Sequence, residues 1–165
     1  MATDLKKVPT KGAGTSFARL VDGKSIDTIN DFLDDANWVT LAKLKDIQPG
    51  EITVEDEEDN YLDDENSEWT KTSPGMKSAG ETQLTIAWLP GETAQQQLAK
   101  DVTDGTITWY RAKYPNGAVD LYYGYVNSLG KAVAQKEKMT RSVKIKNVGK
   151  PMIAEAILAA ASQPA

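Results

Sequence analysis

Hydrophobic and polar positions alternate along much of the chain with a period of two, which is typical of β-strands. The clearest case is residues 81–89, where Thr82, Leu84, Ile86 and Trp88 fall on one face. By the same pattern, strands are predicted at residues 17–21, 38–47, 106–114, 118–126 and, after a turn at Gly130, 131–146. The pattern therefore predicts a mainly β, antiparallel domain.

Residues 93–104 are predicted to form a helix. Thr93 and Gln96 have the spacing of a capping box, and apolar residues recur every four positions from Ala94 onward. Gly105 then provides a stop signal. Residues 25–37 predict a loop with one or two helical turns, and residues 152–161 a short apolar helix.

The order of these elements predicts one domain, an antiparallel β-sandwich or barrel with one flanking helix. Pro115, Asn116 and Gly117 form a strong hairpin signal between two of its strands. Gly12 and Gly14 make residues 1–16 a flexible N-terminal arm. We expect the β domain to span residues 17–150, followed by a C-terminal tail at 151–165.

The net charge of −5 is concentrated in one segment, because nine of the fourteen residues from Glu55 to Glu68 are acidic and none is basic. We read residues 49–71 as a long acidic loop, and a loop of this length is usually functional or disordered. Its aromatic and aliphatic side chains are costly to leave in water, so we expect it to dock on a partner. The residues predicted for this interface are Glu55, Asp56, Glu57, Glu58, Asp59, Tyr61, Leu62, Asp63, Asp64, Glu65 and Trp69.

A basic stretch lies near the C-terminal end of the domain. It reads either as a solvated strand face or as the charge partner of the acidic loop in a neighbouring copy, since complementary charge steers association. Nucleic-acid binding is disfavoured because aromatic residues are not interleaved with the basic ones. Its basic residues are Lys131, Lys136, Lys138, Arg141, Lys144 and Lys146.

The chain contains no Cys and no His, which removes disulfides, thiolate chemistry and His-based catalysis or zinc binding. Two alternatives to a structural role stay open. One is a soluble β-sandwich binding module that uses the acidic loop for a cation or a basic partner. The other is a hydrolase with a carboxylate pair, although nothing in the sequence selects one pair. We expect no enzyme activity and no cofactor.

Short motifs along most of the chain resemble those of the tail tube protein, or major tail protein, of lambda-like long-tailed, non-contractile phages (siphophages). They occur in the order expected for that family. They are KGAGT (11–15), LAKLKDIQPGE (41–51), YLDDE (61–65), WT (69–70), KSAG (77–80), AWLPGE (87–92), YPNG (114–117), LGKAV (129–133) and KNVG (146–149).

The resemblance implies a structural subunit of the virion tail. Six copies would close a ring around a shared inner β-barrel, and rings would stack into a tube through which double-stranded DNA passes during ejection without specific binding. The long loop of the family contacts neighbouring subunits, and here it maps to residues 49–71. Implied partners are further copies of the chain and the tape-measure, tail terminator and tail tip proteins.

Two further expectations concern location and domain content. Residues 1–14 are polar and do not resemble a signal peptide, and no apolar run is long enough for a membrane anchor. We therefore expect assembly in the host cytoplasm. Some relatives carry a second, immunoglobulin-like domain after the position of Pro151, and we expect none here.

Overall fold

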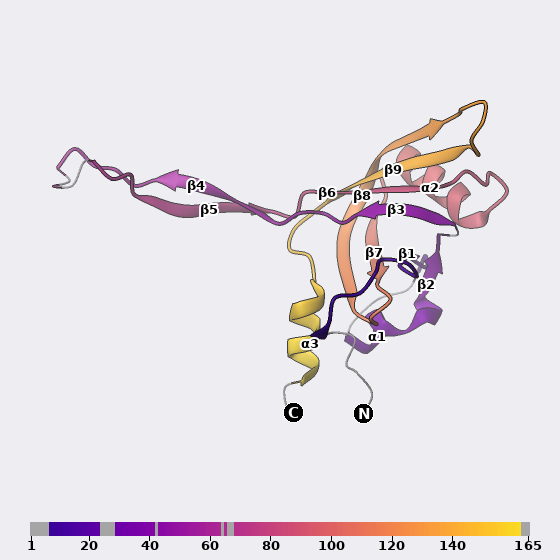
Figure 1. Cartoon of the computed structure of the whole chain (residues 1–165), viewed down its shortest axis with the longest axis horizontal. Coiled ribbons are helices and arrows are strands. Elements are labelled where there is room, and N and C mark those ends of the chain that lie inside the picture. Colours follow the sequence, from indigo (N-terminus) through magenta and orange to yellow (C-terminus); the bar gives the residue numbers. More distant parts are fainter. Residues whose placement is uncertain (1–6, 24–28, 42, 64, 66–67, 163–165) are drawn as a thin grey trace.

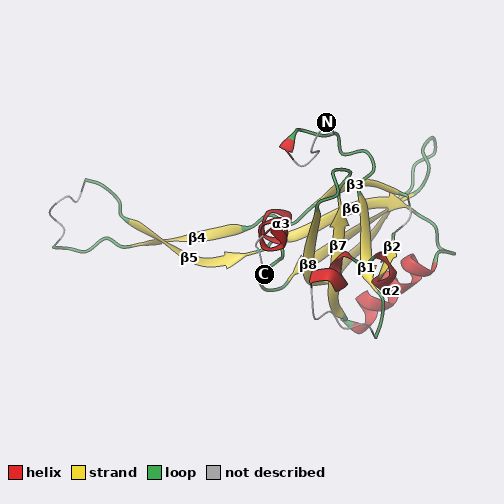
Figure 2. Ribbon diagram, turned by 90° about the horizontal axis from the view of Figure 1, so that it is seen from below, coloured by secondary structure: helices red, strands yellow, loops and turns green. Residues whose placement is uncertain are grey.

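Nine β-strands and three α-helices make up the part of the chain that the computed structural model describes, residues 7–23, 29–41, 43–63, 65 and 68–162. The elements are β1 (Ser16–Leu20), α1 (Ile29–Leu33), the 3-10 helix η2 (Asp35–Asn37), β2 (Trp38–Thr40), β3 (Leu44–Gln48), β4 (Thr53–Glu58), β5 (Thr72–Ser78), β6 (Glu81–Ala87), α2 (Thr93–Asp104), β7 (Ile107–Lys113), β8 (Val119–Ala132), β9 (Thr140–Asn147) and α3 (Ala154–Ser162). Seven strands form one antiparallel sheet in the order β2-β1-β7-β8-β9-β6-β3. β4 and β5 form a separate hairpin that projects from the body (Figures 1 and 2).

The single strand predicted at residues 38–47 is instead two strands, at opposite edges of the sheet. β2 pairs with β1 at one edge, and β3 pairs with β6 at the other. Only three residues separate them, so the facing strand ends lie at most about 14 Å apart. Lys43, with φ of 60°, turns the chain here, and its carbonyl accepts a hydrogen bond from the Ala87 N–H at 3.0 Å. The sheet is therefore strongly curled, but β2 and β3 are not paired, so this chain does not close a barrel by itself.

The main hydrophobic core lies between one face of the sheet and α2. Phe17, Ile86 and Tyr110 of the sheet pack with Leu98 of α2. The helix lies where it was predicted and ends at Gly105, which adopts the left-handed conformation with φ of 69°. The predicted capping box is wrong, because the helix is capped at Glu92 without a side-chain hydrogen bond.

A buried ion pair also ties α2 to the sheet. Asp101 of α2 accepts hydrogen bonds from Arg19 Nε at 2.5 Å and from Arg19 Nη2 at 3.0 Å. Burial lowers the pKa of Arg19, but the hydrogen bonds and charges of Asp101 and Asp22 outweigh this effect and raise the pKa. Arg19 therefore stays charged, and Asp101 is its buried counter-ion.

A second hydrophobic cluster lies where α1 and α3 cover the sheet. Phe32 of α1 and Ile157 of α3 pack there with Leu121 of β8. The predicted C-terminal helix is thus present and docked, and the Ala154 N–H at its start donates a hydrogen bond to Asp120 Oδ1 at 2.6 Å. The described residues thus form three α-helices, α2 being the predicted flanking helix and α1 and α3 lying in the segments predicted as helical turns and as a C-terminal helix.

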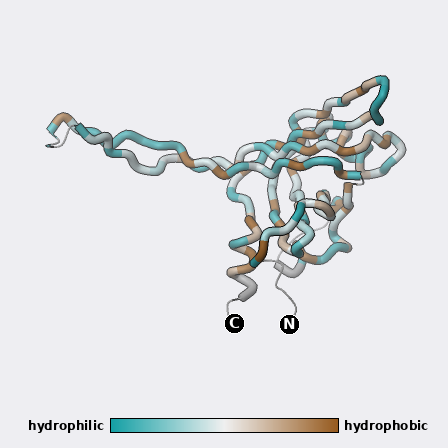
Figure 3. Tube along the Cα trace, viewed as in Figure 1, coloured by the Kyte–Doolittle hydropathy of each residue, from teal (hydrophilic) through white to brown (hydrophobic). Residues whose placement is uncertain are grey.

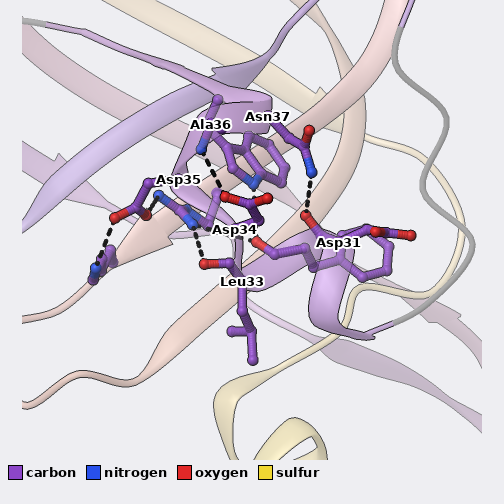
Figure 4. Close-up of polar contacts among 10 residues, drawn as sticks. Asp31, Leu33, Asp34, Asp35, Ala36 and Asn37 are labelled. Atoms are coloured by element: carbon purple, nitrogen blue, oxygen red, sulfur yellow. Dashed lines mark hydrogen bonds and ion pairs between the residues drawn. The ribbon is translucent and has the colours of Figure 1, made fainter.

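Polar contacts hold the segment around η2 against the sheet (Figure 4). Buried Arg111 donates to the Phe32 carbonyl at 3.3 Å and to Asp35 Oδ1 at 2.7 Å, and its guanidinium lies 5.2 Å from the Trp38 ring centroid. Arg111 and Lys113 lower the pKa of Asp35. Residues 29–37 match the predicted loop with one or two helical turns, and residues 25–28 of that prediction lie outside the described residues.

Two further boundaries differ from the prediction. The acidic segment is not a loop throughout, because Thr53–Glu58 pairs with Thr72–Ser78 in the β4–β5 hairpin. β8 also continues through Gly130 to Ala132, so the turn before β9 falls at residues 133–139. Gly130 allows close packing here, since a Cβ at this position would lie 2.7 Å from Ser142 Oγ.

Candidate assembly interface

The β4–β5 hairpin with its connecting residues 59–71 is called the arm below, and its described residues include no member of the hydrophobic clusters. Every residue of β4 is exposed. Figure 3 shows hydrophilic residues along most of the arm and hydrophobic ones at its tip. Such an element buries little apolar surface to offset the entropy cost of its ordering.

The arm carries most of the predicted interface residues. Glu55, Asp56, Glu57 and Glu58 lie on β4, and Asp59 follows directly. Tyr61, Leu62, Asp63, Glu65 and Trp69 lie toward the tip, while Asp64 falls outside the described residues. The side chain of Leu62 is fully exposed and that of Trp69 is 76% exposed. The structure therefore gathers acidic and apolar groups on one projecting element.

A compact polar cluster fixes the base of the arm. Asn147 Nδ2 donates to the Ala79 carbonyl at 3.1 Å and to Thr82 Oγ1 at 3.3 Å, and Thr82 Oγ1 also accepts from the Gly50 N–H at 3.1 Å. A Cβ at Gly50 would collide with Asn147 Nδ2 and lie 2.5 Å from the Ala79 carbonyl oxygen. Gly80 turns the returning chain with φ of 68°. These contacts set the direction in which the arm leaves the sheet.

The end of the sheet opposite the arm, where β3 begins and β6 ends, carries basic residues. Ala87, at the end of β6, pairs with Thr140 of β9, and its N–H donates a hydrogen bond to the Lys43 carbonyl. The Trp88 N–H donates to the Met139 carbonyl at 3.1 Å. The start of β3, the end of β6 and the β8–β9 turn therefore meet there. Figure 1 shows the arm and the β8–β9 turn at opposite ends of the molecule.

The predicted basic residues do not form one patch. Lys136 and Lys138 lie in the β8–β9 turn, and Lys131 lies beside it, with Nζ 4.3 Å from the Trp88 ring centroid. Lys131 is directly opposite Arg141 across the β8–β9 ladder, and like charges in this position are unfavourable. An anionic partner at this end would reduce that repulsion.

Lys144 and Lys146 lie apart from that group, on the exposed face of β9. Lys144 is paired across the ladder with Gln83, and Lys146 with Glu81. The alternation that exposes them buries Val143 and Ile145 on the other face. Sequence reasoning did not select Lys43 and Lys45, which the fold brings to the β8–β9 turn from the start of β3.

The four-stranded part of the sheet, β3-β6-β9-β8, has two open edges within the described residues. β3 pairs only with β6. β8 pairs with β7 from Val119 to Tyr125 and with β9 from Gly124 to Ala132, so its C-terminal half has a free side. Unpaired strand edges are templates for pairing with another chain.

Within the described residues, no group of three or more Asp or Glu side chains lies close enough to hold a metal ion. None of the ion pairs between described residues uses a carboxylate of the arm. None of the helices in this part of the chain is long and apolar enough to span a membrane.

A family model described as "Lambda phage tail tube protein, TTP" matches residues 19–154. The chain belongs to the lambda phage tail tube protein family. It is therefore a structural protein of the virion tail rather than an enzyme. The match covers both the curled sheet and the arm, so the acidic segment belongs to the tail tube domain. A search of curated protein sequences found no match.

Solved structures of tail tubes share the fold of this family member at low sequence identity. The tail of an empty gene transfer agent particle, solved with C6 symmetry, has a TM-score of 0.67 and 12% identity, covering 88% of this chain and 98% of the other. The SPP1 tail tube has a TM-score of 0.59 and 13% identity, covering 91% and 86%. A sheath/tube terminator structure of an extracellular contractile injection system has a TM-score of 0.63 and 8% identity, covering 88% and 96%. The predicted mainly β fold of the tail tube type is confirmed.

Proposed function

We propose that six copies of this tail tube protein close a ring, that rings stack into a hollow tube, and that double-stranded DNA passes through the bore during ejection. The observation that carries the ring is the pair of open edges on β3-β6-β9-β8. All three ladders in this unit are antiparallel. Because the unit has an even number of strands, its two edge strands run in opposite directions.

The opposite directions of the two edge strands suit the formation of a ring. Rotation about an axis roughly along the strands leaves strand direction unchanged, so β3 of one copy meets β8 of the next in antiparallel orientation. The ladder can then continue around the ring without a parallel pair. Closing the edges in this way removes the aggregation hazard that open edges present.

The exposed face of β6 and β9 is our candidate for the bore lining. Gln83, Ser142, Lys144 and Lys146 are exposed there, and Glu81 Oε2 accepts a hydrogen bond from Asn127 Nδ2 at 3.2 Å. This polar face combines acidic and basic groups. Each phosphate neutralised by a cation adds salt-dependent affinity, so mixed charge favours passage of DNA over retention.

The tape-measure, tail terminator and tail tip proteins are proposed partners of the tube. Electron microscopy of the purified full-length protein over a range of concentrations tests the central proposal. We expect six-fold rings and stacked tubes. A chain that stays monomeric at every concentration, with β3 and the second half of β8 fully solvent-accessible by amide exchange, would refute the ring.

A further inference from the structure

Both edge strands of the four-stranded unit β3-β6-β9-β8 carry a β-bulge. Lys45 is an extra residue of β3, because the residues on either side of it pair with successive residues of β6. Asn127 is an extra residue of β8 against β9 for the same reason. The central ladder between β6 and β9 is regular from Glu81 to Ala87. In this unit the register shifts therefore lie in the two outer ladders, on the strands whose other sides are open.

A bulge restricts which strand can pair with an open edge. It bends its own strand, increases the local twist and leaves one residue unpaired. Bulges of this kind twist an edge away from unwanted partners. The space beside β3 is nonetheless open, since residues 44–47 and 12–15 contribute to the lining of a pocket of about 450 Å³. The β3 edge is therefore accessible, but to a strand whose pairing ends at the bulge.

The two bulges fall at opposite ends of the contact that ring closure forms. Lys45 lies near the start of β3, and Asn127 lies near the start of the half of β8 that has a free side. In an antiparallel pair, the start of β3 lies toward the end of β8 of the next copy. The extra residues therefore bound the shared ladder on both sides. Residues 46–48 and 128–132, which lie between them, are free of register shifts.

The side chains of these two stretches specify the register of the contact only weakly. Ile47 and Leu129 are the residues of each stretch that pack against the main core. Most of their neighbours are polar or small, and Gly130 lies in the middle of the β8 stretch. A slip by one residue turns a strand over, and register is poorly specified in polar or Gly-rich strands. Bulges in the backbone can supply the missing specification, because they pin register.

We propose that the bulges at Lys45 and Asn127 set the register in which β3 of one copy pairs with β8 of the next, and that they exclude other strands from both edges. The inference rests on the proposed ring and adds to it the residues that make edge pairing selective. The spacing of the backbone carries this effect, and the two side chains do not. A free subunit can then present two open edges without forming an irregular β-aggregate.

Deletion of the extra residue tests the role of each bulge. Removing Lys45 or Asn127 keeps the buried and exposed faces of the strand, because the flanking residues already pair with successive partner residues. Each deletion variant should stay folded, as checked by thermal unfolding, and should form irregular fibres that bind thioflavin T. By electron microscopy, six-fold rings should need about a tenfold higher protein concentration. Deletion of Ala134, in the exposed β8–β9 turn, should leave ring formation unchanged.

Substitutions that keep the chain length separate the backbone from the side chains. Lys45→Ser and Asn127→Ser retain the extra residue in each strand. Asn127 Nδ2 donates a hydrogen bond to Glu81 Oε2 at 3.2 Å, so the second substitution also removes that contact. Both variants should form rings at the wild-type concentration. Loss of rings in either of them would assign the selectivity to a side chain and overturn the inference.

Amide exchange of the unmodified protein gives a test that does not depend on the folding of a variant. When free subunits form rings, protection of β8 should rise within residues 128–132 and end at Asn127. Protection of β3 should rise after Lys45 and not before it. Protection that continues through either bulge would contradict the proposal.

The remaining outcomes bear on the inference in different ways. Rings formed by either deletion variant at the wild-type concentration would overturn it. Deletion variants that stay monomeric without fibres would also overturn it, because the bulges would then exclude no other pairing. Failure of the unmodified protein to form rings refutes the proposed function itself, before the bulges are tested.

Discussion

The arm and the body of the sheet are both antiparallel β-structure, yet they are stabilised in different ways. Ile86, Tyr110, Val143 and Ile145 in the body are almost completely buried, whereas all six residues of β4 are exposed. The body thus has a core of its own. The arm has two-stranded pairing alone, which is marginal in water without packing against another surface. This difference teaches that the stability of the fold is concentrated in the body, whereas the arm adds exposed surface and little buried area.

The largest effect on folding is expected from Asp101→Asn in the body. The substitution removes the buried counter-charge of Arg19, and breaking a buried pair costs about 3–5 kcal/mol. Urea unfolding under monomeric conditions should show this loss with little change in the m-value.

Asp22→Asn is the matched control for this prediction. Asp22 Oδ1 also accepts from Arg19 Nη2 at 3.0 Å, but the Asp22 side chain is 68% exposed. Its removal should cost less than about 1 kcal/mol. Equal losses for the two variants would show that burial of Asp101 does not set the energy of the pair.

Gly50→Ala tests whether the base of the arm is as tightly built as the body. The added methyl group collides with Asn147 and the Ala79 backbone, and overpacking of this kind costs about 1–3 kcal/mol. We expect a lower melting temperature and weaker tube formation, because the arm leaves the sheet in a changed direction. Gly91→Ala, where a Cβ meets no atom within 4 Å, should change neither.

The sequence predicts the body far better than the arm for a physical reason. In β6 and β9, buried and exposed positions alternate, so the strands are visible in the hydrophobic pattern. β4 reads TVEDEE and is exposed throughout, so it has no such alternation. β5 contains Pro74 and Gly75, which argue against a central strand. A two-stranded arm tolerates Pro74, because each strand has a free edge.

The approach of Lys43 and Lys45 to the β8–β9 turn was missed for a different reason. Lys43 and Lys45 are separated from Lys138 by more than ninety residues of sequence, and they come together because β3 pairs with β6, which in turn pairs with β9. The apolar pattern of residues 38–47 runs through both β2 and β3 and does not reveal the break. The left-handed turn at Lys43 that produces it has no Gly or Asn to signal it.

A smaller effect is expected at the surface of the body, from Asp35→Asn. The Arg111 and Lys113 charges lower the pKa of Asp35, so the stability it contributes is present above its unfolded pKa and is lost as the pH falls through the folded value. Because Asp35 is 68% exposed, we expect a loss below about 1 kcal/mol at neutral pH. Unfolding measured between pH 7 and pH 3 should converge for the two proteins at the acid end; a constant difference would exclude this charge effect.

The smallest effect on folding, and the sharpest test of the comparison, is expected from removing most of the arm. Val54 and Lys77 are paired across the arm, so an Asn-Gly turn joining them restores a short hairpin. Since the described residues of the deleted segment belong to neither hydrophobic cluster, the free energy of unfolding should stay within about 0.5 kcal/mol of the full chain. Rings should still form through the sheet edges, while tubes should not. A loss of several kcal/mol would mean that the arm folds with the body, and the division between a folding unit and an assembly element would then fail.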